Sequence, residues 1–311
     1  MSGPASSGDL AADRRFLWAE ASLRDGDLAA AVDLYAQALE AAPGFAAAAF
    51  GLAAALDRLG EPDAARAAYR RCLDLAPDDP FGAGLGLARL EGLTPVAMPT
   101  SYVAGLFDGY ADRFDAHLVG QLGYRGPGLL RAAIGAACAR SGRIGHFAAA
   151  LDLGCGTGLM AAALDGLIAA LDGIDLSPGM LQKAAALGRY RRLVAGDMTE
   201  WLAAAPPASY GLVTAADVLV YAGALEALFA EVVRVLEPGG LFAVTVQEGE
   251  GADYRLGADL RYAHSRDYLA RLASANGLEV VVLEQAVTRQ DAGRDVPGLV
   301  AVLQKTGAPD R

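Results

Sequence analysis

The sequence has few cysteines and no long apolar run. Its three cysteines, Cys72, Cys138 and Cys155, are too few for a disulfide framework and do not have metal-ligand spacing, so we expect a reduced, cytoplasmic protein without a metal site. No stretch free of Asp, Glu, Lys and Arg exceeds 16 residues, whereas a membrane-spanning helix needs about 20. The first residues also lack the cationic start and apolar core of a secretory signal. We therefore expect neither membrane insertion nor secretion.

Positive charge is scarce as well. The sequence has 26 Lys and Arg against 37 Asp and Glu, which gives a net charge of −11. Nucleic-acid binding depends on neutralising phosphates, so we expect no nucleic-acid partner. The apolar fraction of 54% is ample for sizeable cores. At about 150 residues per domain, a chain of 311 residues predicts two domains.

The first ninety residues contain an internal repeat. Six positions recur after 34 residues: Gly26, Ala31, Tyr35, Ala38, Leu39 and Pro43 become Gly60, Ala65, Tyr69, Cys72, Leu73 and Pro77. The glycine ends one helix, the alanine lets a second helix approach, the tyrosine fills the groove, and the proline stops the second helix. This pattern resembles the tetratricopeptide repeat. It implies a flexible segment over residues 1–13, then an all-α domain of two and a half repeats over residues 14–92.

The resemblance to tetratricopeptide repeats does not name a ligand. Such repeats usually bind a protein partner in a concave groove, and self-association through them is a second possibility. The alternative is a structural arm that shapes the second domain. Residues 93–124 follow as a linker and helical lid, with Pro95 and Pro99 breaking any helix. Aromatic residues recur there at helical spacing, which indicates either core packing or a lid beside a ligand.

The rest of the chain alternates apolar strands with alanine-rich helices. We predict strands near 148–153, 171–175, 192–195, 210–215 and 240–246, helices near 158–169, 178–187 and 222–236, and a final antiparallel pair over 278–287 and 297–304. This alternation predicts a doubly wound, mostly parallel, seven-stranded α/β sheet within a domain over residues 125–311. Ligands of such sheets bind at the carboxyl ends of the strands.

A glycine motif follows the first of these strands. Gly154, Gly156 and Gly158 leave room for close approach of a ligand to the backbone, and Asp152 precedes them. A dinucleotide fingerprint needs its third glycine at position 159, where this sequence has leucine. The motif instead resembles motif I of the class I S-adenosylmethionine-dependent methyltransferases, which have a Rossmann-like fold.

Further features support this resemblance in the expected order along the chain. Asp175 ends the second strand, where the family's acid binds the ribose hydroxyls, and Asp197 matches the acid that reads the adenine amino group. Tyr110, and next Tyr102, match the aromatic residue that covers the methionine portion. The resemblance thus implies S-adenosyl-L-methionine as cofactor and S-adenosyl-L-homocysteine as product. The cofactor-binding residues it implies are Tyr102, Tyr110, Asp152, Gly154, Gly156, Gly158, Asp175, Leu176, Met180, Asp197, Met198 and Ala215.

The catalytic residues are less defined. Asp217 and Tyr221 follow the fourth strand, where Asp217 can orient the acceptor or act as a helix cap. His264 can act as a general base near neutral pH, or it is a loop histidine beside a Ser265 helix cap. The [DNS]-P-P-[YF] motif of adenine and glutamine methylases is missing here. We expect methyl transfer to a small molecule, with oxygen favoured. The alternatives are a protein methyltransferase whose repeats recruit the target and a cofactor-binding adaptor without catalysis.

Overall fold

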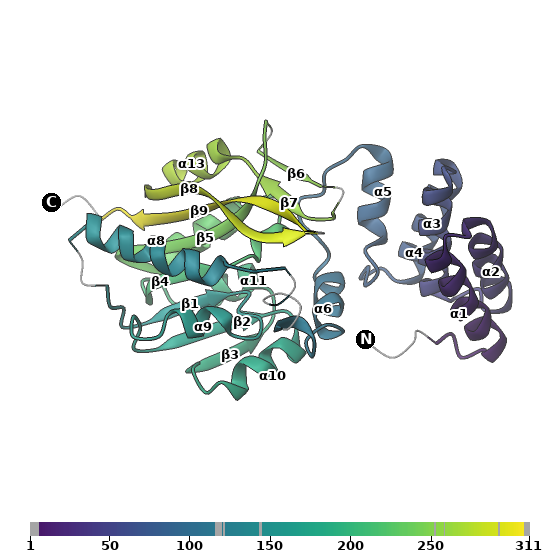
Figure 1. Cartoon of the computed structure of the whole chain (residues 1–311), viewed down its shortest axis with the longest axis horizontal. Helices are drawn as coiled ribbons and strands as arrows, with labels where there is room; N and C mark the ends of the chain where they lie inside the picture. Colours follow the sequence, from purple (N-terminus) through teal and green to yellow (C-terminus); the bar gives the residue numbers. More distant parts are fainter. Residues whose placement is uncertain are drawn as a thin grey trace. The chain divides into compact units, whose positions relative to one another are not determined.

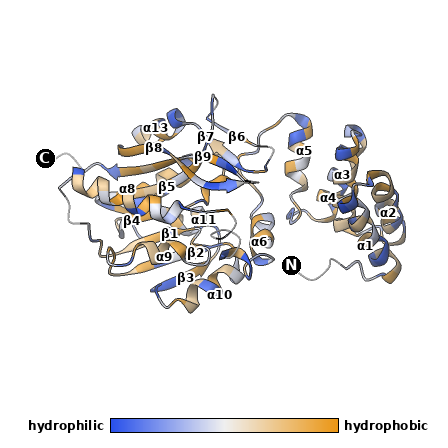
Figure 2. Ribbon diagram, viewed as in Figure 1, coloured by the Kyte–Doolittle hydropathy of each residue, from blue (hydrophilic) through white to orange (hydrophobic). Residues whose placement is uncertain are grey.

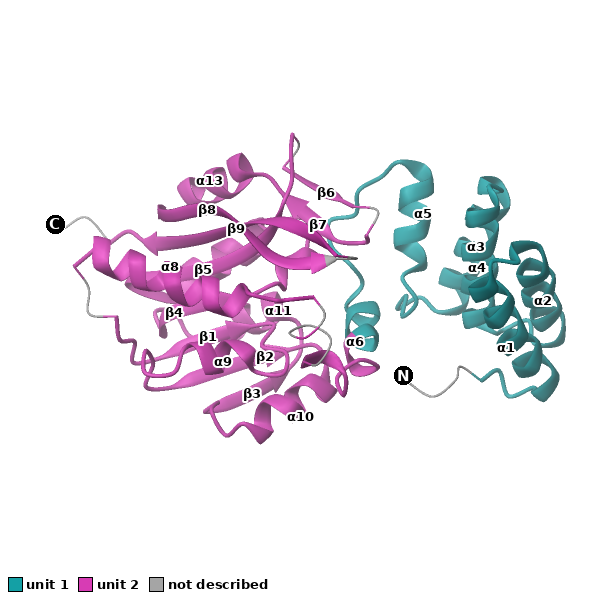
Figure 3. Ribbon diagram, in the orientation of Figure 1, with its two compact units in different colours: residues 1–106 teal, residues 107–311 magenta. Residues whose placement is uncertain are grey.

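The chain forms two compact units in the computed structural model. Met1–Leu106 make up the first and Phe107–Arg311 the second (Figure 3). The structure describes residues 6–115, 120, 122–142, 145–251, 253–257, 259–291 and 293–307. The division after Leu106 falls inside the predicted linker and lid over residues 93–124. Within these described ranges, no helix is both long and apolar enough to cross a membrane.

The N-terminal unit is built from helices. They are α1 (Leu10–Asp25), α2 (Leu28–Ala41), α3 (Ala46–Leu59), α4 (Pro62–Leu75), α5 (Ala83–Glu91) and α6 (Thr100–Asp108), the last of which runs past the end of the unit (Figure 1). The α1 helix begins four residues before the repeat boundary predicted at residue 14. The cause is Asp9, whose carboxylate accepts the N–H groups of Ala11 and Ala12 as an N-cap. The first turn is therefore helical where we predicted flexible chain.

The 34-residue period has a packing basis. Gly26 ends α1 and Gly60 ends α3, both in the left-handed conformation at φ +85°. The buried Tyr35 ring fills the position that a Cβ at Gly51 would need, at 2.4 Å. A Cβ at Gly86 would lie 2.4 Å from the Tyr69 ring in the next repeat. Each tyrosine therefore packs directly on the backbone of the following helix, as the predicted tetratricopeptide architecture requires.

The C-terminal unit is built around a sheet that is nine-stranded over the described residues. Its strands are β1 (Ala150–Leu153), β2 (Leu171–Asp175), β3 (Arg192–Ala195), β4 (Tyr210–Ala215), β5 (Leu236–Glu248), β6 (Tyr254–Leu256), β7 (Tyr262–His264), β8 (Leu278–Asp291) and β9 (Arg294–Lys305). The order β3-β2-β1-β4-β5-β9-β8 forms the predicted seven-stranded core. Neighbouring strands pair in parallel up to β5, and β9 pairs antiparallel with both β5 and β8. The β6–β7 hairpin, which was not predicted, pairs with the end of β5.

Helices cover both faces of this sheet. They are α8 (Gly126–Arg140), α9 (Leu159–Ala163), α10 (Pro178–Ala186), α11 (Met198–Ala204), the 3-10 turn η1 (Leu219–Tyr221), α12 (Glu226–Val235) and α13 (Arg266–Ala275). One core joins the sheet to α8 and α9, and a second joins it to α11, α12 and α13. The central strands between them are buried and largely hydrophobic (Figure 2). The α9 helix is shorter than the predicted 158–169, because Gly166 turns at φ +78° and Ile168 bridges to Phe147.

Candidate functional site

The three glycines after β1 have different structural roles. All have positive φ angles, 63° at Gly154, 53° at Gly156 and 93° at Gly158. A Cβ at Gly154 would lie 2.3 Å from the Val218 side chain, and one at Gly158 would lie 2.6 Å from Leu187. A Cβ at Gly156 would meet no atom within 4 Å. Two of the glycines therefore serve internal packing, whereas Gly156 leaves open space at the carboxyl edge of the sheet.

Asp175 connects the end of β2 to the glycine loop. Its carboxylate accepts the Gly156 N–H at 2.8 Å and the Ser177 N–H at 2.9 Å. Burial raises the pKa of Asp175, and these backbone hydrogen bonds oppose the rise. A carboxylate offers about four lone-pair sites, so both oxygens can accept further hydrogen bonds. The geometry suits a ligand with two neighbouring hydroxyl groups.

Asp152 and Asp197 have structural contacts of their own. The buried Asp152 carboxylate accepts the hydroxyls of Thr214 and Tyr190, each at 2.8 Å. Burial raises the pKa of Asp152 to about 6. Asp197 is the N-cap of α11, and its Oδ1 accepts two N–H groups of the first turn, at 2.8 and 3.0 Å. Asp152 thus links β1 to β4 and to Tyr190, and Asp197 fixes the first turn of α11.

The other predicted cofactor residues fall in both units. Leu176 follows β2, Met180 is buried in α10, Met198 begins α11 and Ala215 ends β4, so all four stand after or at the carboxyl ends of parallel strands. Tyr110 belongs to the same unit, and its ring packs edge-on against Phe114 at 5.7 Å. Tyr102 belongs to the N-terminal unit. There its ring packs on Gly82, at 3.1 Å from the Cβ position.

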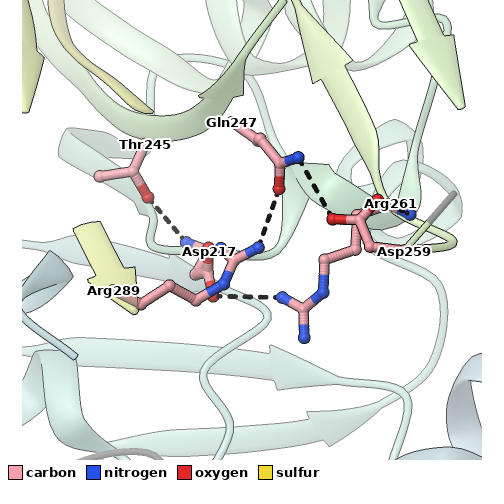
Figure 4. Close-up of polar contacts among 6 residues, drawn as sticks. All are labelled: Asp217, Thr245, Gln247, Asp259, Arg261 and Arg289. Carbon is pink, nitrogen blue, oxygen red and sulfur yellow. Dashed lines mark hydrogen bonds and ion pairs between the residues drawn. The ribbon is translucent and has the colours of Figure 1, made fainter. Parts of the chain in front are cut away.

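Asp217 is the centre of a polar network after β4 (Figure 4). Its carboxylate lies 2.7 Å from the buried Arg289 guanidinium and 3.9 Å from that of Arg261. Its backbone has a φ of +55°, and its N–H donates to the Thr245 hydroxyl at 2.8 Å. Arg289 also donates to Gln247 at 2.9 Å. Burial raises the pKa of Asp217, and the two arginines oppose the rise.

Aromatic rings border this network. Tyr221 lies edge-on to Phe107, with ring centroids 5.3 Å apart, and the Arg261 guanidinium lies 5.9 Å from the Tyr221 centroid. Burial raises the pKa of Tyr124, and the charges of Asp217 and Asp152 raise it further. The backbone beside Tyr124 is joined to β8, because the Arg125 N–H donates to the Thr288 carbonyl at 2.8 Å. Polar, charged and aromatic groups therefore share one region at the strand ends.

Comparison with known proteins agrees with this geometry. Residues 151–244 match the family described as a methyltransferase domain, and residues 22–90 match a tetratricopeptide repeat family. A ubiquinone biosynthesis O-methyltransferase of Thiobacillus denitrificans is 31% identical over 186 residues, which cover 50% of this chain and 78% of that relative. The chain belongs to the S-adenosylmethionine-dependent methyltransferases. The predicted family, its cofactor and the tetratricopeptide region are thereby confirmed.

Two other proteins resemble the methyltransferase. Methyltransferase-like protein 27 of Homo sapiens is 36% identical over 108 residues, which span 33% of this chain and only 42% of that relative. The crystal structure of Burkholderia thailandensis 1,6-didemethyltoxoflavin-N1-methyltransferase, with bound 1,6-didemethyltoxoflavin and S-adenosylhomocysteine, has a TM-score of 0.50 and 23% identity. The match covers 68% of this chain and 92% of that structure. This structural likeness supports the fold.

Three acidic residues that we did not predict connect the segment Phe107–Asp115, here named the cap segment, to α10 and to the glycine loop after β1. Asp108 accepts hydrogen bonds from the Ser177 hydroxyl and from the Gly179 N–H at the start of α10. Asp112 pairs with Lys183 of α10 at 2.7 Å. Asp115 accepts the hydroxyl of Thr157, in the glycine loop, at 2.6 Å. The regular spacing of these acids along the aromatic stripe was the available sequence signal.

His264 lies inside the methyltransferase unit. Its side chain is completely buried, and its Nε2 donates to the Gly223 carbonyl at 3.0 Å. Its Nδ1 has no hydrogen-bond partner among the described residues. Burial lowers the pKa of His264 to about 4, so the ring is neutral near pH 7. Of the two roles considered for His264, these contacts favour the structural one over the general base. The predicted Ser265 cap does begin α13 by accepting the Tyr268 N–H.

Proposed function

We propose that the methyltransferase transfers the methyl group of S-adenosylmethionine to an oxygen atom of a small molecule. The observation that carries the proposal is the Asp217 network, a carboxylate set between arginine and aromatic side chains at the strand ends. A carboxylate is a suitable proton acceptor for a hydroxyl nucleophile. The O-methyltransferase named among the relatives supports the choice of oxygen.

The cofactor would lie along the carboxyl edge of β1, β2 and β4. We assign Gly156 to close backbone approach and Asp175 to the ribose hydroxyls, because the first faces open space and the second retains acceptor capacity. Asp197, with Met198, would border the adenine, together with Leu176 and Met180. Ala215 would adjoin the methionine portion, beside Tyr110 of the cap segment. Asp152, Gly154 and Gly158 would act through the shape of the loop.

Methyl transfer is an in-line displacement, in which the acceptor oxygen forms a bond to the methyl carbon as the bond to sulfur breaks. Holding two reactants in line contributes about 7–11 kcal/mol to such reactions. In our proposal Asp217 accepts the proton that the acceptor hydroxyl loses. Burial raises the pKa of Asp217, which makes its carboxylate a better base than an exposed one, while the Arg289 cation favours the ionised form. Tyr221 would pack against the acceptor.

Transfer of radioactive methyl groups into a cell extract tests the proposal. The purified enzyme is incubated with labelled S-adenosylmethionine and extract, and the products are separated by ultrafiltration. The proposal predicts label in a small molecule that chromatography separates from S-adenosylmethionine, with the methyl group on oxygen and not on nitrogen. Asp217→Asn should lower this incorporation at least about 100-fold, the scale of lost general-base catalysis, while cofactor binding persists.

A second candidate is a protein methyltransferase. The tetratricopeptide region favours it, because such repeats commonly recruit protein partners. It predicts label in the retained protein fraction, on one or a few polypeptides. Substitutions on the repeat surface that leave the fold intact should then abolish labelling. In the small-molecule case, the same substitutions should leave turnover unchanged.

A further inference from the structure

The outer face of α1 exposes large apolar side chains. Leu10, Leu17 and Trp18 are 85%, 53% and 55% exposed. On the opposite face, Ala12 and Ala19 are buried in the core of the repeat unit. The α1 helix is the first of the repeat stack in the described part of the chain, and the terminal helix of such a stack usually has a polar outer face. Exposed apolar side chains gathered on one helix face mark an interaction surface.

The same face has the spacing of a helix–helix seam. Arg14, Trp18, Ala21 and Asp25 follow one another at intervals of four, three and four residues. These intervals place the four residues on one stripe of an α-helix, and they are the intervals between the core positions of a two-helix coiled coil. Arg14 and Asp25 are exposed like Trp18, and Ala21 is half-buried. The stripe of these four residues is here named the α1 seam.

The charges and sizes along the α1 seam are complementary to a second copy of the seam in the antiparallel direction. A twofold axis across the middle of the seam places Arg14 of each copy opposite Asp25 of the other. The same axis places each Trp18 ring opposite the small Ala21 side chain. Among the described residues, neither Arg14 nor Asp25 has an ion-pair partner within the chain. A parallel pair would instead place like charges opposite each other.

We propose that the protein pairs with a second copy of itself through the α1 seam, as an antiparallel twofold dimer. The two copies then contribute the same surface patch, as in most symmetric dimers. Trp18 is the central contact, because large aromatic side chains contribute most to the affinity of an interface. The α1 helix has 16 residues and is about 24 Å long. One such seam is small beside the roughly 1,200–2,000 Å² of stable interfaces, so the dimer is reversible.

Analytical ultracentrifugation of the full chain over a concentration series tests the proposal. The wild type should show a reversible equilibrium between monomer and dimer. Trp18→Glu should raise the dissociation constant at least about thirtyfold, the scale of a lost interface hot spot. The matched control is Leu93→Glu, which replaces a leucine that is 61% exposed and lies after α5, outside the seam. This control should dimerise as the wild type does.

Charge reversal tests the antiparallel direction. Arg14→Glu and Asp25→Arg each place two like-charged pairs in the dimer, so each should raise the dissociation constant at least about fivefold. The double variant with both changes should dimerise as the wild type does, because its pairs are again of opposite sign. An equimolar mixture of the two single variants should also dimerise, since both pairs of the mixed dimer are of opposite sign.

Every other outcome overturns a stated part of the proposal. A wild type that is monomeric at all concentrations overturns self-association, and the apolar face of α1 then contacts a different protein. A dimer that persists undiminished in Trp18→Glu excludes the α1 seam as the interface. A double variant as weak as the two single variants overturns the antiparallel pairing. Circular dichroism and thermal unfolding should match the wild type in each variant, because the replaced side chains are exposed.

Discussion

The Arg289 guanidinium lies 2.7 Å from the Asp217 carboxylate, although 72 residues separate the two in the sequence. Asp217 follows β4, whereas Arg289 belongs to β8, the strand at the far edge of the core sheet. The last hairpin therefore supplies the cation that holds the proposed base. Burial raises the pKa of this carboxylate, and the Arg289 cation opposes the rise and so favours the ionised form.

Replacing Arg289 by Gln should change the pH dependence of activity. Loss of the cation leaves burial to raise the pKa of Asp217 further, so the rising limb of the rate against pH should move to higher pH. Removing one partner of a buried pair also costs about 3–5 kcal/mol of unfolding free energy. The matched control is Arg294→Gln, which removes an exposed arginine of β9. An unchanged pH profile in a folded Arg289→Gln protein would rule out Asp217 as the titrating base.

The glycine loop offers a comparison between packing and ligand space. Gly154→Ala should destabilise the protein by several kcal/mol, because its Cβ would lie 2.3 Å from Val218 and φ is +63°. In Gly156→Ala the new Cβ meets no atom within 4 Å, so the free energy of unfolding should fall by only about 1–2 kcal/mol, because of the positive φ. It should nevertheless lose cofactor affinity, because the methyl group enters the space assigned to the ligand. Thermal unfolding and calorimetry with S-adenosylhomocysteine measure the two effects, and normal affinity in Gly156→Ala would disprove that assignment.

Asp152 should make stability fall as the pH rises. Its pKa is raised from 3.8 to about 6, so the folded protein holds this proton more tightly than the unfolded chain does. The stabilisation is complete below pH 4 and is lost as the pH rises through 6. Asp152→Asn cannot ionise, so its stability relative to wild type should improve from pH 4 to pH 7, by up to about 3 kcal/mol. Urea unfolding at a series of pH values checks this, with the exposed Asp165→Asn as control. A difference in unfolding free energy between Asp152→Asn and the wild type that stays constant with pH would refute it.

The repeat unit allows a matched test of its packing. Gly51→Ala places a Cβ 2.4 Å from the Tyr35 ring. It should therefore lower the free energy of unfolding by about 1–3 kcal/mol, because the buried tyrosine must shift. Gly44→Ala, in the preceding turn, meets no atom within 4 Å and does not have a positive φ. The unfolding temperature of Gly44→Ala should therefore stay within about a degree or two of the wild-type value. Equal effects of the two substitutions in calorimetric scans would contradict this account of the 34-residue period.

Most of the features that could be predicted from the sequence depend on short-range patterns. The 34-residue period, the glycine spacing and Asp175 at a strand end each depend on neighbours in the chain, and the structure has the predicted elements around them. Arg289 was not identified, because only the strand order brings it to Asp217. His264 looked like a base because the sequence does not report its complete burial. The α8 helix was missed because its alanine-rich sequence has no clear apolar stripe.

Titration of the purified protein with S-adenosylhomocysteine tests the central claim, that the glycine loop and Asp175 form the cofactor site. We predict saturable binding by the wild type and an affinity reduced at least about tenfold in Asp175→Ala, since two hydrogen bonds to a charged group are lost. The exposed Asp165→Ala should bind as the wild type does. Undiminished binding by a folded Asp175→Ala protein, or no binding by the wild type, would contradict the account.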